Sequence, residues 1–198
     1  MLFKNLSSEI DVDDDEFDII YPEELRNISY IHFTPIDVSK VAAKFLVKKD
    51  KLKVLDIGSG TGKFCMVGAA CTKGRFYGIE NREHLTKIAI KISKKYKLNN
   101  VEFICANINS IDFKNYDAFY FYNSFYENIC EFEEVIDEVE INNHLYDLYS
   151  NYVKKQLEKM PIGTRLATYY SSRDIAPDSF HVIKSDFDEK LKLWEKVE

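Results

Sequence analysis

The residues best suited to chemistry lie in and directly after a short apolar run, residues 54–57. Asp56, within this run, supplies a carboxylate. Three alternating glycines come directly after the run, Gly58, Gly60 and Gly62. Because glycine has no side chain, a turn built in this way lets a ligand approach the backbone closely. The run itself suits a strand that is buried on both faces. The segment therefore predicts a strand and turn that cradle a nucleotide-like ligand.

Glu80 ends a second apolar run, residues 75–79, roughly 20 residues beyond the glycines, the distance at which dinucleotide-binding folds place an acid on the ribose hydroxyls. A dinucleotide site needs the spacing Gly-x-Gly-x-x-Gly so that a pyrophosphate rests on the following helix. Here Lys63 stands where the third glycine of that pattern belongs, and Gly62 comes one residue early. The spacing therefore favours a nucleoside cofactor without a pyrophosphate.

The resulting Asp-x-Gly-x-Gly-x-Gly pattern resembles motif I of the class I methyltransferases, which use S-adenosyl-L-methionine. The resemblance implies an α/β, Rossmann-like fold with a seven-stranded, mostly parallel sheet flanked by helices. It also implies an enzyme that transfers a methyl group and whose glycine turn meets the amino-acid part of the cofactor. Asp56 is expected to act there directly or by holding the amides of the turn.

Strand ends supply the other expected cofactor contacts, because ligands of open α/β sheets bind at the carboxyl ends of the strands. Glu80 is expected to accept hydrogen bonds from both ribose hydroxyls. Asn107 stands where many members of the family carry an acid that reaches the adenine amine, and its amide oxygen accepts the same hydrogen bond. The expected cofactor-binding residues are Thr34, Asp56, Gly58, Ser59, Gly60, Gly62, Glu80, Asn107, Ile108 and Asn123.

The fourth strand is expected to end in the segment Tyr122-Asn123-Ser124-Phe125-Tyr126. It is similar to the Asn-Pro-Pro-Tyr element with which amino-methylating enzymes hold a planar nitrogen, although Ser124 and Phe125 replace both prolines. It resembles more closely a bacterial methyltransferase group distantly related to the non-SET histone-lysine methyltransferases. The matching residues are Gly78-Ile79-Glu80 and Asn123 with Phe125, and the resemblance covers roughly residues 21–195.

Three residues are candidates for the chemical step: Asn123, Tyr126 and His32. The Asn123 amide or a neighbouring carbonyl is expected to orient the acceptor. Tyr126, Phe125 and Phe33 either wall the pocket, where aromatic rings attract a sulfonium cation, or belong to the core. His32 is either a base near neutral pH or a structural histidine. The segment from Tyr30 to Pro35 is expected to lie across the cofactor.

The elements that must position these residues alternate between strand and helix, as right-handed βαβ wiring requires. Thr34 and Pro35 predict a helix start, with Thr34 as N-cap and Pro35 at the first helical position. The expected strands are 53–57, 75–79, 101–105, 116–122 and 164–170, with a closing hairpin from 180–185 and 190–194. The expected helices are 34–46, 62–71 and 83–97 and a helical region from 131 to about 160.

Composition and charge divide the chain into an acidic N-terminal arm, residues 1–20, and a single methyltransferase domain, residues 21–198. The 198 residues include 45% hydrophobic side chains, enough for one sizeable core. The net charge is −6, but residues 1–35 carry −7 and the remainder +1. The acidic run 13–18 is expected to be a solvated arm or to bind a basic partner. Lysines within 83–97 are expected to form a solvated helix face.

Other features exclude several classes of protein. No apolar run is long enough to span a membrane, and the N-terminus is not a signal peptide, so a cytoplasmic protein is expected. Cys65, Cys71, Cys105 and Cys130 form no Cys-x-x-Cys pair, and we expect reduced, buried thiols and no metal. The methyl acceptor is expected to be an amino group, on a protein or a small molecule rather than nucleic acid. Two alternatives remain open: a catalytically silent cofactor-binding subunit and an NAD-dependent oxidoreductase.

Overall fold

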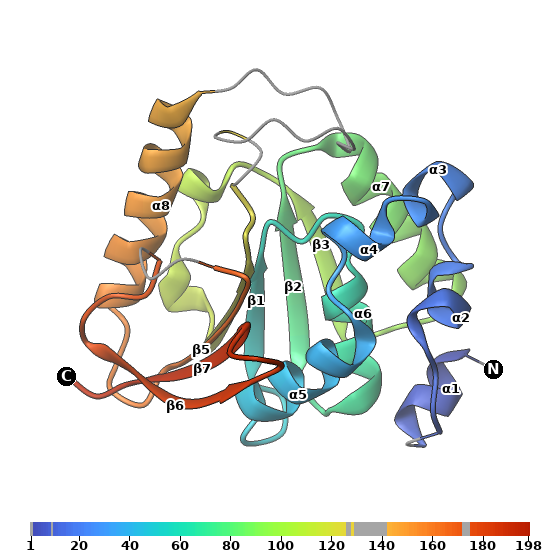
Figure 1. Cartoon of the computed structure of the whole chain (residues 1–198), viewed down its shortest axis with the longest axis horizontal. Coiled ribbons are helices and arrows are strands. Elements are labelled where there is room, and N and C mark those ends of the chain that lie inside the picture. Colours follow the sequence, from blue (N-terminus) through green and yellow to red (C-terminus); the bar gives the residue numbers. More distant parts are fainter. Residues whose placement is uncertain (1, 9, 126–127, 129–141, 172–174) are drawn as a thin grey trace.

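A seven-stranded sheet with strand order β3-β2-β1-β4-β5-β7-β6 forms the centre of the computed structural model (Figure 1). The structure describes residues 2–8, 10–125, 128, 142–171 and 175–198. β7 is antiparallel to both of its neighbours, and the remaining neighbour pairs are parallel. The strands are β1 (Lys53–Ile57), β2 (Arg75–Glu80), β3 (Val101–Cys105), β4 (Ala118–Tyr122), β5 (Arg165–Tyr169), β6 (Phe180–Asp186) and β7 (Leu191–Lys196). The predicted architecture is confirmed.

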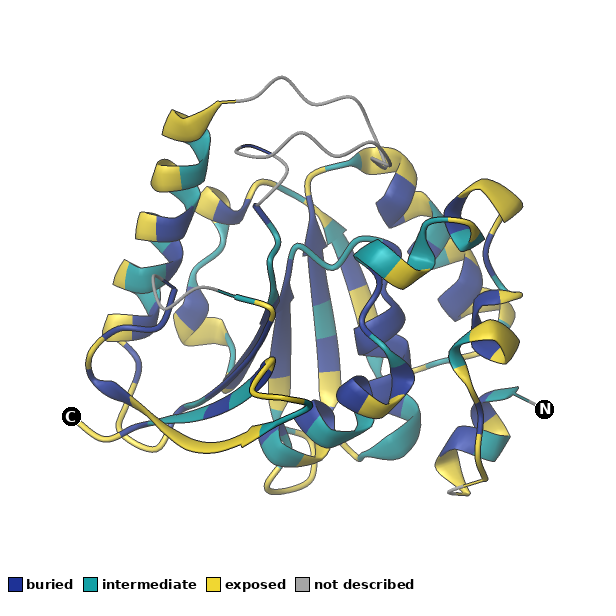
Figure 2. Cartoon of the chain, viewed as in Figure 1, coloured by how far each residue is buried: buried dark blue, intermediate teal, exposed yellow. Residues whose placement is uncertain are grey.

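Helices cover both faces of the sheet and enclose two apolar clusters (Figure 2). One face carries α5 (Ile36–Leu46), α6 (Lys63–Cys71) and α7 (Glu83–Lys95). The other carries α8 (Asn143–Glu158) and two short 3₁₀ helices, η1 (Ile108–Ser110) and η2 (Phe113–Asn115). Because both faces are covered, Val54, Leu55 and Ile57 of β1 are fully buried, as the continuous apolar run indicated.

Two expectations about element ends and burial are corrected. Helix α5 begins at Ile36 with Pro35 in the N-cap position, so Thr34 is not the N-cap. The cysteines also differ from one another: Cys65 is buried, Cys71 is half-buried and Cys105 is exposed. Cys130 and the first part of the helical region expected from residue 131 lie outside the described residues. No helix in the described ranges is both long and apolar enough to cross a membrane.

The acidic N-terminal segment packs on the outside of α6 and is not a solvated arm (Figure 1). The described residues from 2 to 32 form the short helices α1 (Leu2–Ser7), α2 (Asp14–Asp18), α3 (Glu23–Arg26) and α4 (Ser29–His32), of which α1 and α2 belong to the acidic segment. Phe3, Leu6, Val12 and Phe17 are buried in the same cluster as the inner face of α6. Apolar residues interspersed among the acids therefore decide the placement of this segment. The division of the chain at residue 20 stays a prediction.

A buried ion pair fixes this segment to the helix that follows the glycine turn. Lys63, the first residue of α6, is only 4% exposed. Its Nζ lies 2.7 Å from Oδ1 of both Asp14 and Asp18, and it lies 5.5 Å from the centroid of the Phe17 ring. Burial raises the pKa of Asp18, and the charge and hydrogen bond of Lys63 act against that rise. The same Oδ1 of Asp14 accepts the Ile36 amide, 2.9 Å away, at the start of α5.

Removing the cation should destabilise the fold strongly, because the buried Asp18 carboxylate would lose its counterion. We expect Lys63→Met to lower the free energy of unfolding in urea by about 3 kcal/mol. The double substitution Lys63→Met with Asp18→Asn should recover part of that loss. The control is Lys87→Met, which breaks the exposed pair with Glu83 at 3.0 Å and should cost below about 0.5 kcal/mol. Equal losses for Lys63→Met and Lys87→Met would contradict a structural ion pair.

Candidate active site

The glycine turn connects the end of β1 to α6 and lies at the carboxyl edge of the sheet. Gly58 has a φ of +72°, and a Cβ there would overlap the side chain of Ser124 at the end of β4. Gly60, with a φ of +53°, is different, because a side chain there would meet no atom within 4 Å. One glycine is thus required for packing between strand ends, and the other leaves open space above the turn.

Asp56 lies beneath this turn and is 4% exposed. Its Oδ2 accepts a hydrogen bond from the Cys65 thiol of α6 at 3.3 Å. Burial raises the pKa of Asp56 to about 7 against the effect of that hydrogen bond, and the Glu80 charge adds to the rise. The expectation that Asp56 holds the amides of the turn is not met in these contacts. An amide of the turn instead binds the other acid, because the Gly60 N–H donates to Glu80 Oε2 at 3.0 Å.

Glu80 at the end of β2 is the most heavily hydrogen-bonded acid of the site, and it is 3% exposed. The Arg82 amide and Nε donate to Oε1 at 3.0 and 2.9 Å, and Arg82 Nη2 donates to Oε2 at 3.2 Å. Burial alone would raise the pKa of Glu80, but the Arg82 guanidinium and the two backbone amides outweigh burial and lower it. Glu80 is therefore ionised at neutral pH. Arg82 was not among the candidates, although a cation two residues after the acid was visible in the sequence.

Asn107 after β3 makes contacts other than the expected one. Its Oδ1 accepts the Asn109 amide at 3.0 Å and caps η1, so the amide oxygen expected on the adenine amine is engaged by the backbone. Its Nδ2 donates to the Tyr149 hydroxyl of α8 at 2.9 Å. The sequence carried no signal for Tyr149, because it follows Asn107 by 42 residues and only the fold brings α8 to this edge.

A cavity of about 180 Å³ opens between these groups. The ends of β1, β2 and β3, the segment after β4 and helix α8 all contribute to its wall. Polar and apolar groups alternate around it, which suits a nucleoside with hydrogen-bonding edges and a flat base. The lining residues are Gly58, Ile79, Glu80, Asn81, Arg82, Ala106, Asn107, Ile108, Ser124, Phe125, Asn128, Leu145 and Tyr149.

Asn123 directly follows β4 and has a left-handed backbone with a φ of +44°. The backbone amide of Asn123 donates to the Ser171 hydroxyl at 3.3 Å, and that hydroxyl donates to the Tyr169 carbonyl at 3.0 Å. Ser124 donates to the Ile57 carbonyl at the end of β1. These contacts join the ends of β1, β4 and β5 at one edge of the sheet. Neither serine was a candidate from the sequence.

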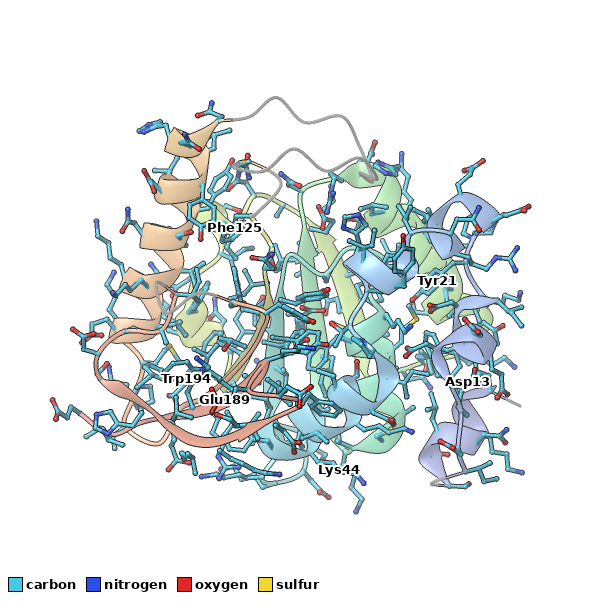
Figure 3. All side chains as sticks on the ribbon, viewed as in Figure 1. Asp13, Tyr21, Lys44, Phe125, Glu189 and Trp194 are labelled. Atoms are coloured by element: carbon cyan, nitrogen blue, oxygen red, sulfur yellow. The ribbon has the colours of Figure 1, made fainter. Side chains whose placement is uncertain are left out.

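The candidate aromatic and titratable residues separate into different environments. Phe125 lines the cavity and packs against Phe121 and Tyr149, with ring centroids 5.4 Å apart in both pairs. Phe33 is a core residue, 6% exposed and in contact with Tyr21. Figure 3 shows Phe125 beside α8 and Tyr21 near the N-terminal helices, on opposite sides of the view. His32 is half-buried at the end of α4. Tyr126 lies outside the described residues.

The segment before α5 is fixed to β4 by two tyrosines. The Thr34 hydroxyl and the Tyr120 hydroxyl are hydrogen-bonded at 2.9 Å, and the Tyr122 hydroxyl donates to the Ile31 carbonyl at 2.7 Å. Tyr120 also stacks on Phe64 of α6, with centroids 3.7 Å apart. Thr34 is 5% exposed, so its hydroxyl serves this buried contact. Its role in cofactor binding stays a prediction.

Comparison with known proteins agrees with this geometry. A family model described as a methyltransferase domain matches residues 48–161, more than half of the chain. The match spans the glycine turn, Glu80, Asn107 and Asn123. No curated protein is similar enough in sequence to be matched with the chain. The finer resemblance to the group related to non-SET histone-lysine methyltransferases stays a prediction.

Solved structures show the same fold at low sequence identity. TrmN from Thermus thermophilus has a TM-score of 0.61 at 14% identity over 85% of this chain, which spans about half, 51%, of the TrmN chain. An RNA methyltransferase from Salinibacter ruber, solved with S-adenosyl-L-homocysteine, has a TM-score of 0.58 at 19% identity, with 83% of this chain and 94% of that chain covered.

A SAM-dependent O-methyltransferase from Thermotoga maritima has a TM-score of 0.55 at 22% identity, with 89% of this chain and 72% of that chain covered. At such identities the likeness shows the fold alone, and the family match adds the membership. The chain belongs to the methyltransferase-domain family.

Proposed function

We propose that the protein transfers the methyl group of S-adenosylmethionine to an amino nitrogen, with the adenosine part of the cofactor in the 180 Å³ cavity. The observation that carries the acceptor proposal is the position of Asn123. Its left-handed backbone, at a φ of +44°, turns the chain at the end of β4, and its backbone amide is hydrogen-bonded to the Ser171 hydroxyl. A side-chain amide at that point accepts an N–H hydrogen bond from an amine and so orients the nitrogen lone pair.

The residues present fit the cofactor. Glu80 is ionised and accepts hydrogen bonds, as two ribose hydroxyls require, but the Arg82 guanidinium occupies both of its oxygens. Arg82 also lines the cavity, so its release frees Glu80 and enlarges the space. Open space above Gly60 accommodates the amino-acid end next to the turn. Phe125 and Tyr149 offer apolar surface for the base.

Methyl transfer is an in-line displacement, and positioning accounts for much of such catalysis. The bound cofactor supplies an electrophilic methyl group on a sulfonium. Asn123 would hold the neutral amine with its lone pair directed at that methyl group. The N-methylated amine would then lose a proton. His32, half-buried on α4, is the candidate to receive that proton, and Tyr126 stays a candidate for the wall of the acceptor site.

The acceptor is proposed to be an amine of a protein or a small molecule. The net charge of −6 opposes binding to nucleic-acid phosphates. The solved relatives include one named for RNA and one for O-methylation, so the shared fold does not choose among acceptors. The choice therefore rests on Asn123 and on the charge.

Labelled cofactor tests the function directly. We expect isothermal titration to show binding of S-adenosylmethionine and S-adenosylhomocysteine but not of NAD, because no pyrophosphate fits the turn. Incubation with the methyl-labelled cofactor and a fractionated lysate should label proteins or small amines. Label in the RNA fraction would overturn the amine proposal. Binding without transfer to any fraction would indicate the catalytically silent subunit.

Glu80 and Arg82 should have opposite effects on cofactor affinity. Glu80→Gln removes a charged acceptor, and we expect a 10- to 100-fold weaker Kd for S-adenosylhomocysteine, about 1.5 to 3 kcal/mol. Arg82→Ala removes the guanidinium that competes for the same oxygens, so the Kd should be unchanged or tighter. Calorimetry measures both variants, and urea unfolding verifies that they fold. Equal weakening by both would show that Arg82 binds the cofactor instead of competing with it.

Substitution of Asn123 should affect turnover more than cofactor binding. Both Asn123→Gly and Asn123→Asp tolerate the left-handed backbone, so the loss of the amide is separated from strain. We expect kcat to fall at least about tenfold in Asn123→Gly, because one positioned hydrogen bond to the acceptor is lost, and to fall less in Asn123→Asp, because its carboxylate oxygen still accepts an N–H hydrogen bond. The Kd for S-adenosylhomocysteine should change less than about threefold. Equal losses in kcat and in cofactor affinity would remove the acceptor-orienting role.

A further inference from the structure

Three tyrosines form a cluster beside Asn123 that the proposed cofactor contacts do not use. Tyr122 and Tyr169 are register partners at the ends of β4 and β5, with ring centroids 5.0 Å apart. Tyr170 follows β5, and its centroid lies 4.8 Å from that of Tyr169 and 6.4 Å from that of Tyr122. The three rings therefore pack as a unit at the edge of the sheet where the methyl group is transferred.

The cluster has a buried base and an exposed ring. Tyr169 is 7% exposed, and the hydroxyl of Tyr122 is bonded to the Ile31 carbonyl, so neither ring is free to move away. Tyr170 is 52% exposed. Two packed aromatic rings thus support a third that is partly exposed to solvent.

The backbone at Tyr170 holds the ring in place at a cost. Its φ is +48°, a conformation that a bulky residue rarely adopts and that costs on the order of 1 to 2 kcal/mol. Asn123, the next position of the adjacent parallel strand, has the same left-handed conformation. Ser171 comes directly after Tyr170, and its hydroxyl accepts a hydrogen bond from the backbone amide of Asn123. Strain at two adjoining strand ends is typical of functional sites.

A cation of the chain itself already lies on the exposed ring. Lys190 Nζ is 5.3 Å from the centroid of the Tyr170 ring, within the range of a cation–π interaction. The Tyr170 amide donates to the Lys190 carbonyl at 3.0 Å, which fixes the two residues side by side. The pKa of Lys190 is raised, mainly by a hydrogen bond with Tyr170, and the charge of Asp188 adds to the rise. The surroundings therefore favour a positive charge.

We propose that the Tyr170 ring, supported by Tyr122 and Tyr169, binds an alkylammonium group of the methyl acceptor and that Lys190 occupies this place until the acceptor arrives. The inference rests on the proposed function, because it assumes an amine acceptor beside Asn123. The chemical class is an aliphatic chain that ends in a protonated amine, as in a lysine side chain or a polyamine. The ring binds the protonated amine, which must lose one proton to solvent before the neutral amine can react at Asn123. The ring therefore contributes to acceptor binding and so to KM more than to kcat.

Variants of Tyr170 and Lys190 separate the ring from the backbone and from the competing cation. Tyr170→Phe keeps the aromatic face, whereas Tyr170→Asn removes it but suits the left-handed backbone. Lys190→Met keeps the length of the side chain and removes the charge. Ile183→Ala, at a residue of β6 that is 55% exposed, is the matched surface control.

The probes are Nα-acetyl-lysine amide, spermidine and uncharged Nα-acetyl-norleucine amide, titrated into the full chain saturated with S-adenosylhomocysteine. We expect Tyr170→Asn to weaken binding of an amine probe by about 3- to 30-fold. Tyr170→Phe and Ile183→Ala should lie within about twofold of the unchanged protein, and Lys190→Met should bind more tightly. The amine that binds more tightly identifies the source, a lysine side chain or a polyamine.

Three results would overturn the inference: equal binding by Tyr170→Asn and the unchanged protein, weaker binding after Lys190→Met, or equal binding of the norleucine probe. The S-adenosylhomocysteine titration that precedes each experiment keeps the two proposals apart. If S-adenosylhomocysteine fails to bind, the proposed cofactor site is wrong. If it binds and the amine pattern is absent, only the role of Tyr170 is wrong.

Discussion

The buried ion pair between Lys63 and the two aspartates of α2 is the interaction on which the rest of the site depends. Lys63 opens the helix that follows the glycine turn, and a buried cation there requires the carboxylates of Asp14 and Asp18 at 2.7 Å. Asp14 also accepts the first amide of α5. One carboxylate thus joins the N-terminal segment, α5 and α6. This junction also fixes the position of the glycine turn, because the turn ends where α6 begins, at Lys63.

Two acids lie close to the turn, and their different surroundings shift their pKa values in opposite directions. Asp56 has a pKa raised to about 7 by burial, whereas Arg82 and two backbone amides lower the pKa of Glu80. The ionised Glu80 is also the acid that holds the Gly60 amide. A single negative charge beside the turn at slightly acid pH avoids repulsion between two buried carboxylates. The division of roles follows from hydrogen bonding, which spacing in the sequence does not reveal.

Sequence patterns predicted the order of strands and helices, which depends on local periodicity. They did not predict contacts between residues that are far apart in the sequence. The strand and helix order followed from apolar runs and glycines, and Glu80 and Asn123 were found as strand ends at one edge. The acidic segment was misread as a solvated arm, because the partner of Asp14 and Asp18 is Lys63, some 45 residues later. The adenine contact of Asn107 stays a prediction, and the local hydrogen bond from the Asn109 amide to its oxygen was not foreseen. Tyr149 was missed because only the fold brings α8 to this edge.

Several groups at the ligand-binding edge are already paired within the chain. Glu80 holds Arg82, Asn107 holds Tyr149, and the Tyr170 ring receives Lys190. A buried carboxylate or amide without a partner is costly, so internal partners stabilise the protein before any ligand binds. Each ligand contact must then replace an existing one, and affinity reflects only the difference between the two. In the proposed site, selectivity would follow from this exchange, because a ligand that lacks a hydroxyl pair or an ammonium group would not compensate for the partner that it displaces.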